Sequence, residues 1–285
     1  MIAVTGATGQ LGRLVIEALL KKVPAADIIA AVRSPEKAKD IAALGVQVRK
    51  ADYSQPDTLV SAFSGVEKVL LISSSEVGAR EAQHKSVIAA AKEAGVLLLA
   101  YTSLLHADTT PLGLGSEHRS TEQALIASGV PFAILRNGWY TENYAASIAP
   151  AVAHGAFIGA AGEGKIASAS RQDYAEAAAA VLTSSGAAGK TYELAGDTAY
   201  TLAEFSAEIA QKSGKEIQYV NMSQAEFSAA LKGAGLPDWL AEMLADSDAG
   251  AAQGALFDDG RTLSKLIGRP TTPWQDVVSA FVAKV

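Results

Sequence analysis

Three glycines near the start of the chain are spaced for contact with a phosphate group. Gly6, Gly9 and Gly12 give the pattern G-x-x-G-x-x-G directly after a short apolar run. Gly6 permits a tight turn, Gly9 removes a side chain where backbone would approach a pyrophosphate, and Gly12 allows close packing of the first helix. The amino end of that helix presents free N–H groups and a positive dipole. Because the motif lies between a predicted strand and a predicted amphipathic helix, we interpret it as a dinucleotide site rather than as a packing turn.

Arg33 ends the second predicted strand, at the position that distinguishes the two nicotinamide dinucleotides. Sites for NAD usually carry Asp or Glu here to bind the ribose 2′-hydroxyl. The nearest preceding acid, Asp27, lies at the opposite end of this strand. A guanidinium can bind a 2′-phosphate through two hydrogen bonds, so Arg33 favours NADPH and NADP over NADH. The alternative is a solvated arginine at a strand end.

Short apolar runs alternate with longer helical patterns through the first half of the chain. Strands are predicted at residues 2–5, 28–32, 46–49, 69–72, 96–101 and 132–135. Helices are predicted at residues 10–22, 56–63, 81–94 and 116–128. A further helix is expected to begin with Ser34 as its N-cap and Pro35 in its first turn. This alternation predicts an α/β fold with a doubly wound, Rossmann-type parallel sheet and helices on both faces.

After residue 136 the alternation loosens, and helical patterns dominate at residues 173–182, 202–212, 224–231 and 274–282. We therefore predict an NADP-binding domain in residues 1–136. A smaller, mostly helical lobe is predicted in residues 137–285, interleaved with the sheet. Ligands of such sheets bind beyond the carboxyl ends of the strands. Ser73, Ser74 and Ser75 follow the fourth strand at that edge, where they line the predicted site or simply form a polar strand end.

The composition excludes several classes of function. The chain has 285 residues, of which 30 are acidic and 24 basic, so its net charge of −6 disfavours binding to a nucleic-acid backbone. It has no cysteine, and its four histidines lack the close spacing of metal ligands, so no metal site is predicted. No signal sequence and no apolar run of about 20 residues is present. We therefore expect a cytoplasmic protein with no membrane span.

Three segments resemble the NmrA-like group of atypical short-chain dehydrogenase/reductase proteins. They are the glycine turn, the segment Leu135-Arg136-Asn137-Gly138-Trp139-Tyr140-Thr141-Glu142-Asn143, and the segment Arg171-Gln172-Asp173-Tyr174-Ala175. The resemblance covers the whole chain. Residues 71–78 and 101–108 are similar to the bacterial quinone reductases of this group. That resemblance implies transfer of hydride from NADPH to a small-molecule quinone without a bound flavin.

The resemblance also implies roles for individual residues. The phosphate loop, the strand ends and one arginine of the smaller lobe would bind the cofactor: Gly6, Ala7, Thr8, Gly9, Gln10, Leu11, Arg33, Ser73, Ser74, Ser75, Asn137, Gly138, Trp139, Tyr140, Thr141, Glu142 and Arg171. We further expect Tyr140, Asn143 or His118 to donate a hydrogen bond to the acceptor oxygen. The alternatives are a packing role for Tyr140 and a surface histidine at 118 that pairs with Glu122. Glu76 and Arg80 are expected to form at most a local pair.

The sequence departs from the wider family at its proton donor. Typical members carry Tyr-x-x-x-Lys, in which lysine lowers the pKa of tyrosine, and none of the eight tyrosines here has lysine four positions later. Thr102-Ser103 stands where the catalytic serine is expected, and His118-x-x-x-Glu122 replaces the tyrosine and lysine. This loss disfavours alcohol oxidation and sugar-nucleotide epimerisation, whereas an electrophilic quinone needs no tuned base.

Two further questions stay open at this level. An NADP-binding redox sensor that acts through a protein partner, without chemistry of its own, is the alternative to a reductase. A homodimer is allowed, since nothing in the sequence fixes the oligomeric state.

Overall fold

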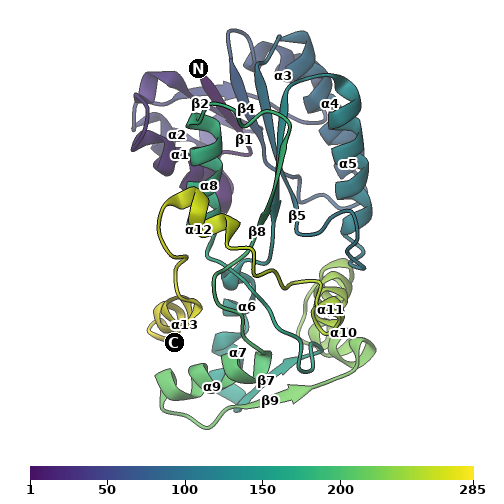
Figure 1. Ribbon diagram of the computed structural model, residues 1–285. Helices are drawn as coiled ribbons and strands as arrows, with labels where there is room; N and C mark the ends of the chain where they lie inside the picture. Colours follow the sequence, from purple (N-terminus) through teal and green to yellow (C-terminus); the bar gives the residue numbers. More distant parts are fainter. The chain divides into compact units, whose positions relative to one another are not determined.

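One sheet of seven strands organises the first part of the structure, a computed structural model that describes residues 1–285 (Figure 1). The strand order is β3-β2-β1-β4-β5-β6-β8. The strands are β1 (Ile2–Thr5), β2 (Ile28–Val32), β3 (Gln47–Lys50), β4 (Lys68–Leu71), β5 (Leu98–Leu104), β6 (Phe132–Asn137) and β8 (Lys190–Leu194). The strands from β3 to β6 pair in parallel, with Val4 between Ala30 of β2 and Leu70 of β4. The chain order reverses between β1 and β4, and such a reversal is where doubly wound sheets bind ligands.

The strands form where apolar residues are buried on both faces. Every residue of β1, β2 and β5 is buried, as expected for parallel strands that lie between two layers of helices. β3, near the edge of the sheet, has half-buried and exposed side chains only. The predicted Rossmann-type parallel sheet is therefore confirmed.

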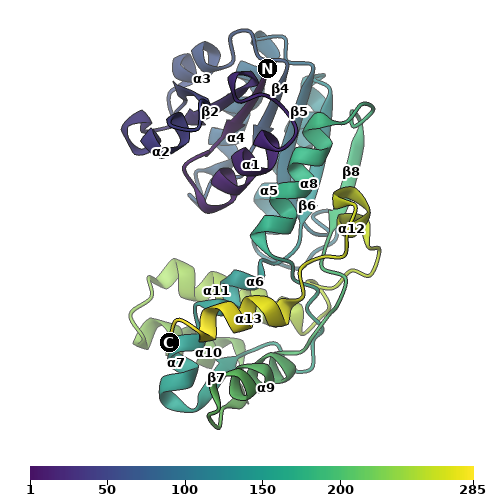
Figure 2. The same ribbon diagram turned by 90° about the vertical axis from the view of Figure 1, so that its left-hand side faces the viewer.

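Helices cover both faces of this sheet. They are α1 (Gln10–Leu20), α2 (Lys39–Ala42), α3 (Pro56–Ala62), α4 (Arg80–Glu93), α5 (Gly115–Ser128) and α8 (Arg171–Thr183). In Figures 1 and 2, α1 and α8 lie together on one face and α3, α4 and α5 on the other. α1 packs on β1 and β2 with Leu11, Val15, Ile16 and Leu19, the apolar positions of its helical pattern.

One predicted helix start is wrong. Residues 35–37 form only a single 3₁₀ turn, η2 (Pro35–Lys37), and the Ser34 side chain makes no capping hydrogen bond. A second such turn, η1 (Ala25–Asp27), precedes β2. Three residues are too few to bury an apolar face, so the local signal of serine and proline is not extended into a helix.

A second group of elements forms around a small parallel sheet. β7 (Ala156–Gly159) pairs with β9 (Gln218–Asn221), and neither strand was expected from the sequence. The helices are α6 (Thr141–Ala145), α7 (Ile148–His154), α9 (Leu202–Ser213), α10 (Gln224–Gly233), α11 (Asp238–Ala251), α12 (Thr262–Ile267) and α13 (Trp274–Val282). Their core is aromatic: the rings of Tyr200 and Trp274 lie 4.6 Å apart, and Phe205 contacts both.

The chain thus divides into two units, each with its own core. The first unit comprises Met1–Ala107, Ser116–Asn137 and Arg171–Tyr192. The second unit comprises Asp108–Gly115, Gly138–Ser170 and Glu193–Val285. The division into two domains at residue 136, expected from the sequence, stays a prediction. None of the helices has both the length and the apolar character needed to cross a membrane.

Candidate functional site

The glycine turn joins β1 to α1 in the first unit and has the predicted backbone geometry. Gly6 has a φ of +60°, a conformation that L side chains rarely adopt. A Cβ atom at Gly12 would lie 2.4 Å from the Gly6 carbonyl oxygen and 2.7 Å from the Ala7 Cα. Gly12 is therefore required for close packing of the helix against the turn itself. A Cβ at Gly9 would meet only the Gly6 carbonyl oxygen, at 3.2 Å, so the backbone at Gly9 is otherwise open.

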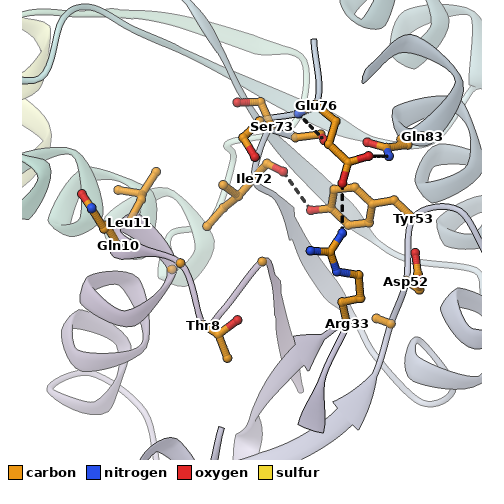
Figure 3. A pocket seen from close by; sticks show the side chains of 16 residues that line it. Thr8, Gln10, Leu11, Arg33, Asp52, Tyr53, Ile72, Ser73, Glu76 and Gln83 are labelled. Carbon is orange, nitrogen blue, oxygen red and sulfur yellow. Dashed lines mark hydrogen bonds and ion pairs between the residues drawn. The ribbon is translucent and has the colours of Figure 1, made fainter. Parts of the chain in front are cut away.

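A cavity of about 360 Å³ opens beside this turn, at the carboxyl ends of β1, β2 and β4 (Figure 3). Nine of the predicted cofactor residues line it: Gly6, Thr8, Gly9, Gln10, Leu11, Arg33, Ser73, Ser74 and Ser75. Ala7 is fully buried and does not line it. The amino end of α1 lies at the cavity, and its N-cap residue Gly9 offers no capping side chain. Free N–H groups and the helix dipole are thus available to an anion, which fits a dinucleotide pyrophosphate.

Tyr53 and Asp52 also line the cavity, although the sequence analysis did not single them out. The Tyr53 hydroxyl donates to the Ile72 carbonyl oxygen at 2.8 Å and bonds to Thr5 Oγ1. Burial raises the pKa of Tyr53 above its usual value, so the phenol stays protonated. The missed signal was positional, since both residues follow β3 at the edge of the sheet where ligands bind.

Arg33 lies at one corner of the cavity, where it pairs with Glu76. Its Nη1 donates to Glu76 Oε1 at 2.9 Å, and both side chains are largely exposed. The other oxygen, Glu76 Oε2, accepts from Gln83 Nε2 at 2.7 Å. The expected local pair of Glu76 and Arg80 is wrong, because Arg80 pairs instead with Glu117 of α5. Arg33 therefore remains a candidate to bind a phosphate, with an acid beside it.

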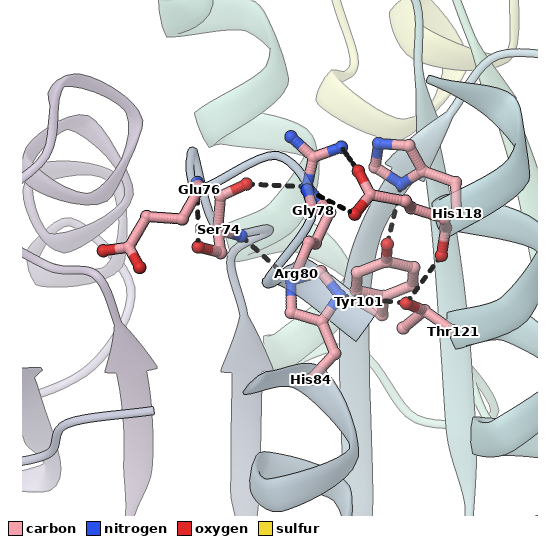
Figure 4. A network of polar contacts seen from close by, with 9 residues as sticks. Ser74, Glu76, Gly78, Arg80, His84, Tyr101, His118 and Thr121 are labelled. Carbon is pink, nitrogen blue, oxygen red and sulfur yellow. Dashed lines mark hydrogen bonds and ion pairs between the residues drawn. The ribbon is translucent and has the colours of Figure 1, made fainter. Parts of the chain in front are cut away.

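A buried polar network holds the serine segment after β4 (Figure 4). The Ser74 N–H donates to His84 Nε2 at 2.9 Å, and His84 Nδ1 lies 3.0 Å from Thr121 Oγ1. Arg80 Nε donates to the Ser74 carbonyl oxygen at 2.7 Å. Glu117 receives both the Gly78 N–H and Arg80 Nη1. Ser74 is thus held by two side chains of α4, which side chains of α5 hold in turn.

His118 does not form the predicted surface pair with Glu122. It is buried, and its Nδ1 lies 2.7 Å from the Tyr101 hydroxyl. Glu122 instead receives two hydrogen bonds from Arg136 and one from Ser103. Burial, and secondarily the cation of Arg80, lowers the pKa of His118 to about 3, so the ring is neutral near pH 7.

The residues after β6 divide between the two units. Asn137 ends β6 in the first unit, where its Oδ1 is buried without a hydrogen-bond partner. Tyr140 is the N-cap of α6 in the second unit, and Thr141 Oγ1 lies 2.8 Å from Ser168 Oγ. Arg171 begins α8, in the first unit. The remaining predicted residues of this segment, all in the second unit, are Gly138, Trp139, Glu142 and Asn143.

Comparisons with known proteins agree on the class of ligand. A family model described as NAD(P)H-binding matches residues 6–185. Quinone oxidoreductase 2 of Escherichia coli strain K12 is 62% identical over 279 residues, which cover 98% of each chain. A crystal structure of an NADPH-dependent quinone oxidoreductase of Escherichia coli with NADPH has a TM-score of 0.97 and covers 98% of this chain and 99% of that one. The triphenylmethane reductase of a Citrobacter species, in complex with NADP(H), is 39% identical with a TM-score of 0.95, covering 99% and 100% of the two chains.

Proposed function

Because the chain belongs to the NAD(P)H-binding family, we propose that it is an NADPH-dependent oxidoreductase that transfers hydride to a quinone or a similar electrophilic conjugated acceptor, without flavin. The observation that carries this proposal is the cavity at the glycine turn. It combines an uncapped helix end with an arginine directly after the second strand, which supports binding of a dinucleotide with a 2′-phosphate. The nicotinamide cofactor, when bound, supplies the hydride.

The first unit would bind and orient the dinucleotide. The turn from Gly6 to Leu11 would receive the pyrophosphate, and Arg33 would bind the 2′-phosphate. Ser73, Ser74 and Ser75 would line the nicotinamide ribose. Asn137 is suited to a ligand donor because its buried Oδ1 has no partner in the chain. The other proposed cofactor contacts are Ala7, Gly138, Trp139, Tyr140, Thr141, Glu142 and Arg171.

The acceptor oxygen needs only a hydrogen-bond donor, because the reduced quinone spreads its negative charge over a conjugated ring. Tyr140 and Asn143 are proposed for this role, since both are half-buried side chains at the start of α6. His118 is a third candidate, and as a neutral ring it would donate rather than carry charge. The absence of Tyr-x-x-x-Lys fits this chemistry, which removes no proton from an alcohol.

The test follows NADPH absorbance at 340 nm with a simple benzoquinone, with and without protein, beside the visible spectrum of the protein. Saturable, protein-dependent loss of NADPH without flavin absorbance is the expected result. NADPH binding without turnover on any quinone would contradict the proposed reaction. It would favour an NADP sensor that acts through a protein partner.

Arg33→Ala tests the cofactor assignment. It should weaken NADPH binding by about 10- to 100-fold, the value of a charge-assisted pair of hydrogen bonds, and NADH binding by far less. Equal weakening of both dinucleotides would remove Arg33 from its proposed role.

We further propose that the protein is cytoplasmic and does not bind nucleic acid, as its net charge of −6 favours. We also propose a homodimer, which gel filtration with light scattering would detect.

A further inference from the structure

Glu76 is fixed at the corner of the cavity that contains Arg33 (Figure 3). Its two carboxylate oxygens accept hydrogen bonds from Arg33 Nη1 at 2.9 Å and from Gln83 Nε2 at 2.7 Å. Its backbone N–H donates to Ser74 Oγ at 3.1 Å. Gln83 is only 7% exposed and also lines the cavity. The carboxylate therefore belongs to the cavity wall, where two hydrogen bonds orient a half-exposed side chain.

The charges around this corner do not add up to a strong phosphate site. Arg33 is the one cation that lines the cavity, whereas Asp52 and Glu76 are both carboxylates. The two acids differ in their contacts. Asp52 Oδ1 accepts the Ser54 N–H at 2.9 Å, whereas Glu76 Oε1 accepts directly from Arg33. A phosphate that binds Arg33 must meet the like charge of Glu76 or displace it from the guanidinium.

The same carboxylate suits the adenosine ribose of NADH, which carries a 2′-hydroxyl group in place of the 2′-phosphate. A 2′-hydroxyl group donates a hydrogen bond to an Asp or Glu in sites that bind NAD, where the acid ordinarily follows the second strand. Here Arg33 directly follows that strand, and an acid reaches the same corner from the segment after β4, 43 residues further along the chain. Both kinds of recognition group are thus present within one hydrogen bond of each other.

We propose that Glu76 is a specificity-determining residue that lowers the preference of this site for NADPH over NADH. Its carboxylate opposes the 2′-phosphate of NADPH and accepts a hydrogen bond from the ribose 2′-hydroxyl of NADH. The inference rests on the proposed function, in which Arg33 binds the 2′-phosphate. Because the Arg33 and Glu76 side chains are 70% and 49% exposed, the ion pair is weak enough for either ligand to displace it.

The test is Glu76→Gln, which removes the charge and keeps the shape of the side chain. Dissociation constants for NADPH and NADH are measured on the purified full chain by nucleotide fluorescence. The ratio of the NADH dissociation constant to the NADPH dissociation constant should rise about three- to tenfold. NADPH no longer meets a like charge at its 2′-phosphate, and NADH no longer has a charged acceptor for its 2′-hydroxyl. The gain for NADPH should shrink in high salt, since salt screens exposed charges.

Glu81→Gln is the matched control. Glu81 is 46% exposed and pairs with Lys85 at 2.6 Å on the surface of α4, and it does not line the cavity. The Glu81→Gln variant changes the net charge by the same amount as Glu76→Gln. Its ratio of dissociation constants should nevertheless stay within about twofold of that of the unsubstituted protein. Competition by 2′,5′-ADP and 5′-AMP, which lack nicotinamide, should show the same change of ratio in Glu76→Gln and locate it at the adenosine end.

An unchanged or lower ratio in Glu76→Gln would overturn the inference, because the carboxylate would then be neutral or would hold Arg33 for the phosphate. Failure of the proposed function gives a different result. In that case the unsubstituted protein binds neither dinucleotide, or it binds NADPH without turnover on a quinone.

Discussion

The first unit of this protein buries two histidines and the second unit buries an aspartate, and burial shifts their pKa values in opposite directions. The first unit buries His84 and His118, and burial lowers the pKa of each to about 3. The second unit buries Asp248, whose pKa is raised to about 6 by burial, against hydrogen bonds from Tyr144 and the Ala160 N–H. Burial favours the neutral form in both units, but a base whose pKa is lowered and an acid whose pKa is raised change stability with pH in opposite directions.

One helix of each unit shows a further contrast, at its amino end. α1 of the first unit begins at Gly9 with no capping side chain, beside the cavity. α9 of the second unit begins with a capping box, in which Thr201 and Glu204 satisfy each other's backbone N–H groups. The amino end of α1 therefore remains open to a ligand, whereas the amino end of α9 is closed by its own side chains.

Lowering the pH should have the largest effect on stability, through the buried histidines of the first unit. A histidine whose folded pKa lies below its unfolded value of 6.5 stabilises the fold above pH 6.5, and this contribution is lost as pH falls toward 3. At pH 4.5 the loss should be about 2–3 kcal/mol for each of His84 and His118. Denaturant unfolding at pH 7.5 and 4.5 measures it. In His84→Gln, which cannot titrate at this position, the loss should be smaller by about 2–3 kcal/mol; an unchanged loss would assign it elsewhere.

Gly12→Ala should be the next largest effect. The added methyl group would overlap backbone atoms of Gly6 and Ala7 that cannot move independently, so we expect a loss of about 3 kcal/mol or more and no measurable NADPH binding. Thermal melting and fluorescence titration check both. Gly233→Ala in α10 is the control, because no atom lies within 4 Å of its added Cβ. A tolerated Gly12→Ala would contradict the tight turn.

Asp248 should act with the opposite sign to the histidines. Its folded pKa of about 6 lies above the ordinary 3.8, so the folded state binds the proton more tightly and loses stability as pH rises through 6. Asp248→Asn removes this titration. Its free energy of unfolding, relative to the unsubstituted protein, should therefore improve by about 2 kcal/mol between pH 4.5 and pH 7.5. A difference independent of pH would show that Asp248 is not buried as an acid.

Thr201→Ala should have the smallest effect. It removes the side chain that accepts the Glu204 N–H at the start of α9, which should cost about 1 kcal/mol. The dissociation constant for NADPH should stay unchanged, because Thr201 does not line the cavity. Weaker NADPH binding in this variant would mean that the second unit is coupled to the nucleotide site more closely than separate cores imply.

Local sequence predicted several of the residues that line the cavity beside the glycine turn. The glycine turn, Arg33 and the serines after β4 line one cavity because each follows a parallel strand, and the carboxyl ends of parallel strands meet at one edge. Tyr53 and Gln83 were not identified. Tyr53 was accessible to the same rule, whereas Gln83 lies inside a helix, where no local signal separates a cavity residue from a core residue.

The sequence alone determined which segments form the buried parallel strands and which glycine turn opens the first helix beside the cavity, because burial on both faces and glycine spacing act over a few residues. Tertiary structure decided which charges meet. Glu76 pairs with Arg33 and not with its neighbour Arg80. Glu122 pairs with Arg136 and not with His118, which contacts Tyr101. The strands β7 and β9 likewise form only when distant segments pair. Ion pairs and strand pairs depend on distances across the fold, which periodicity along the chain does not contain.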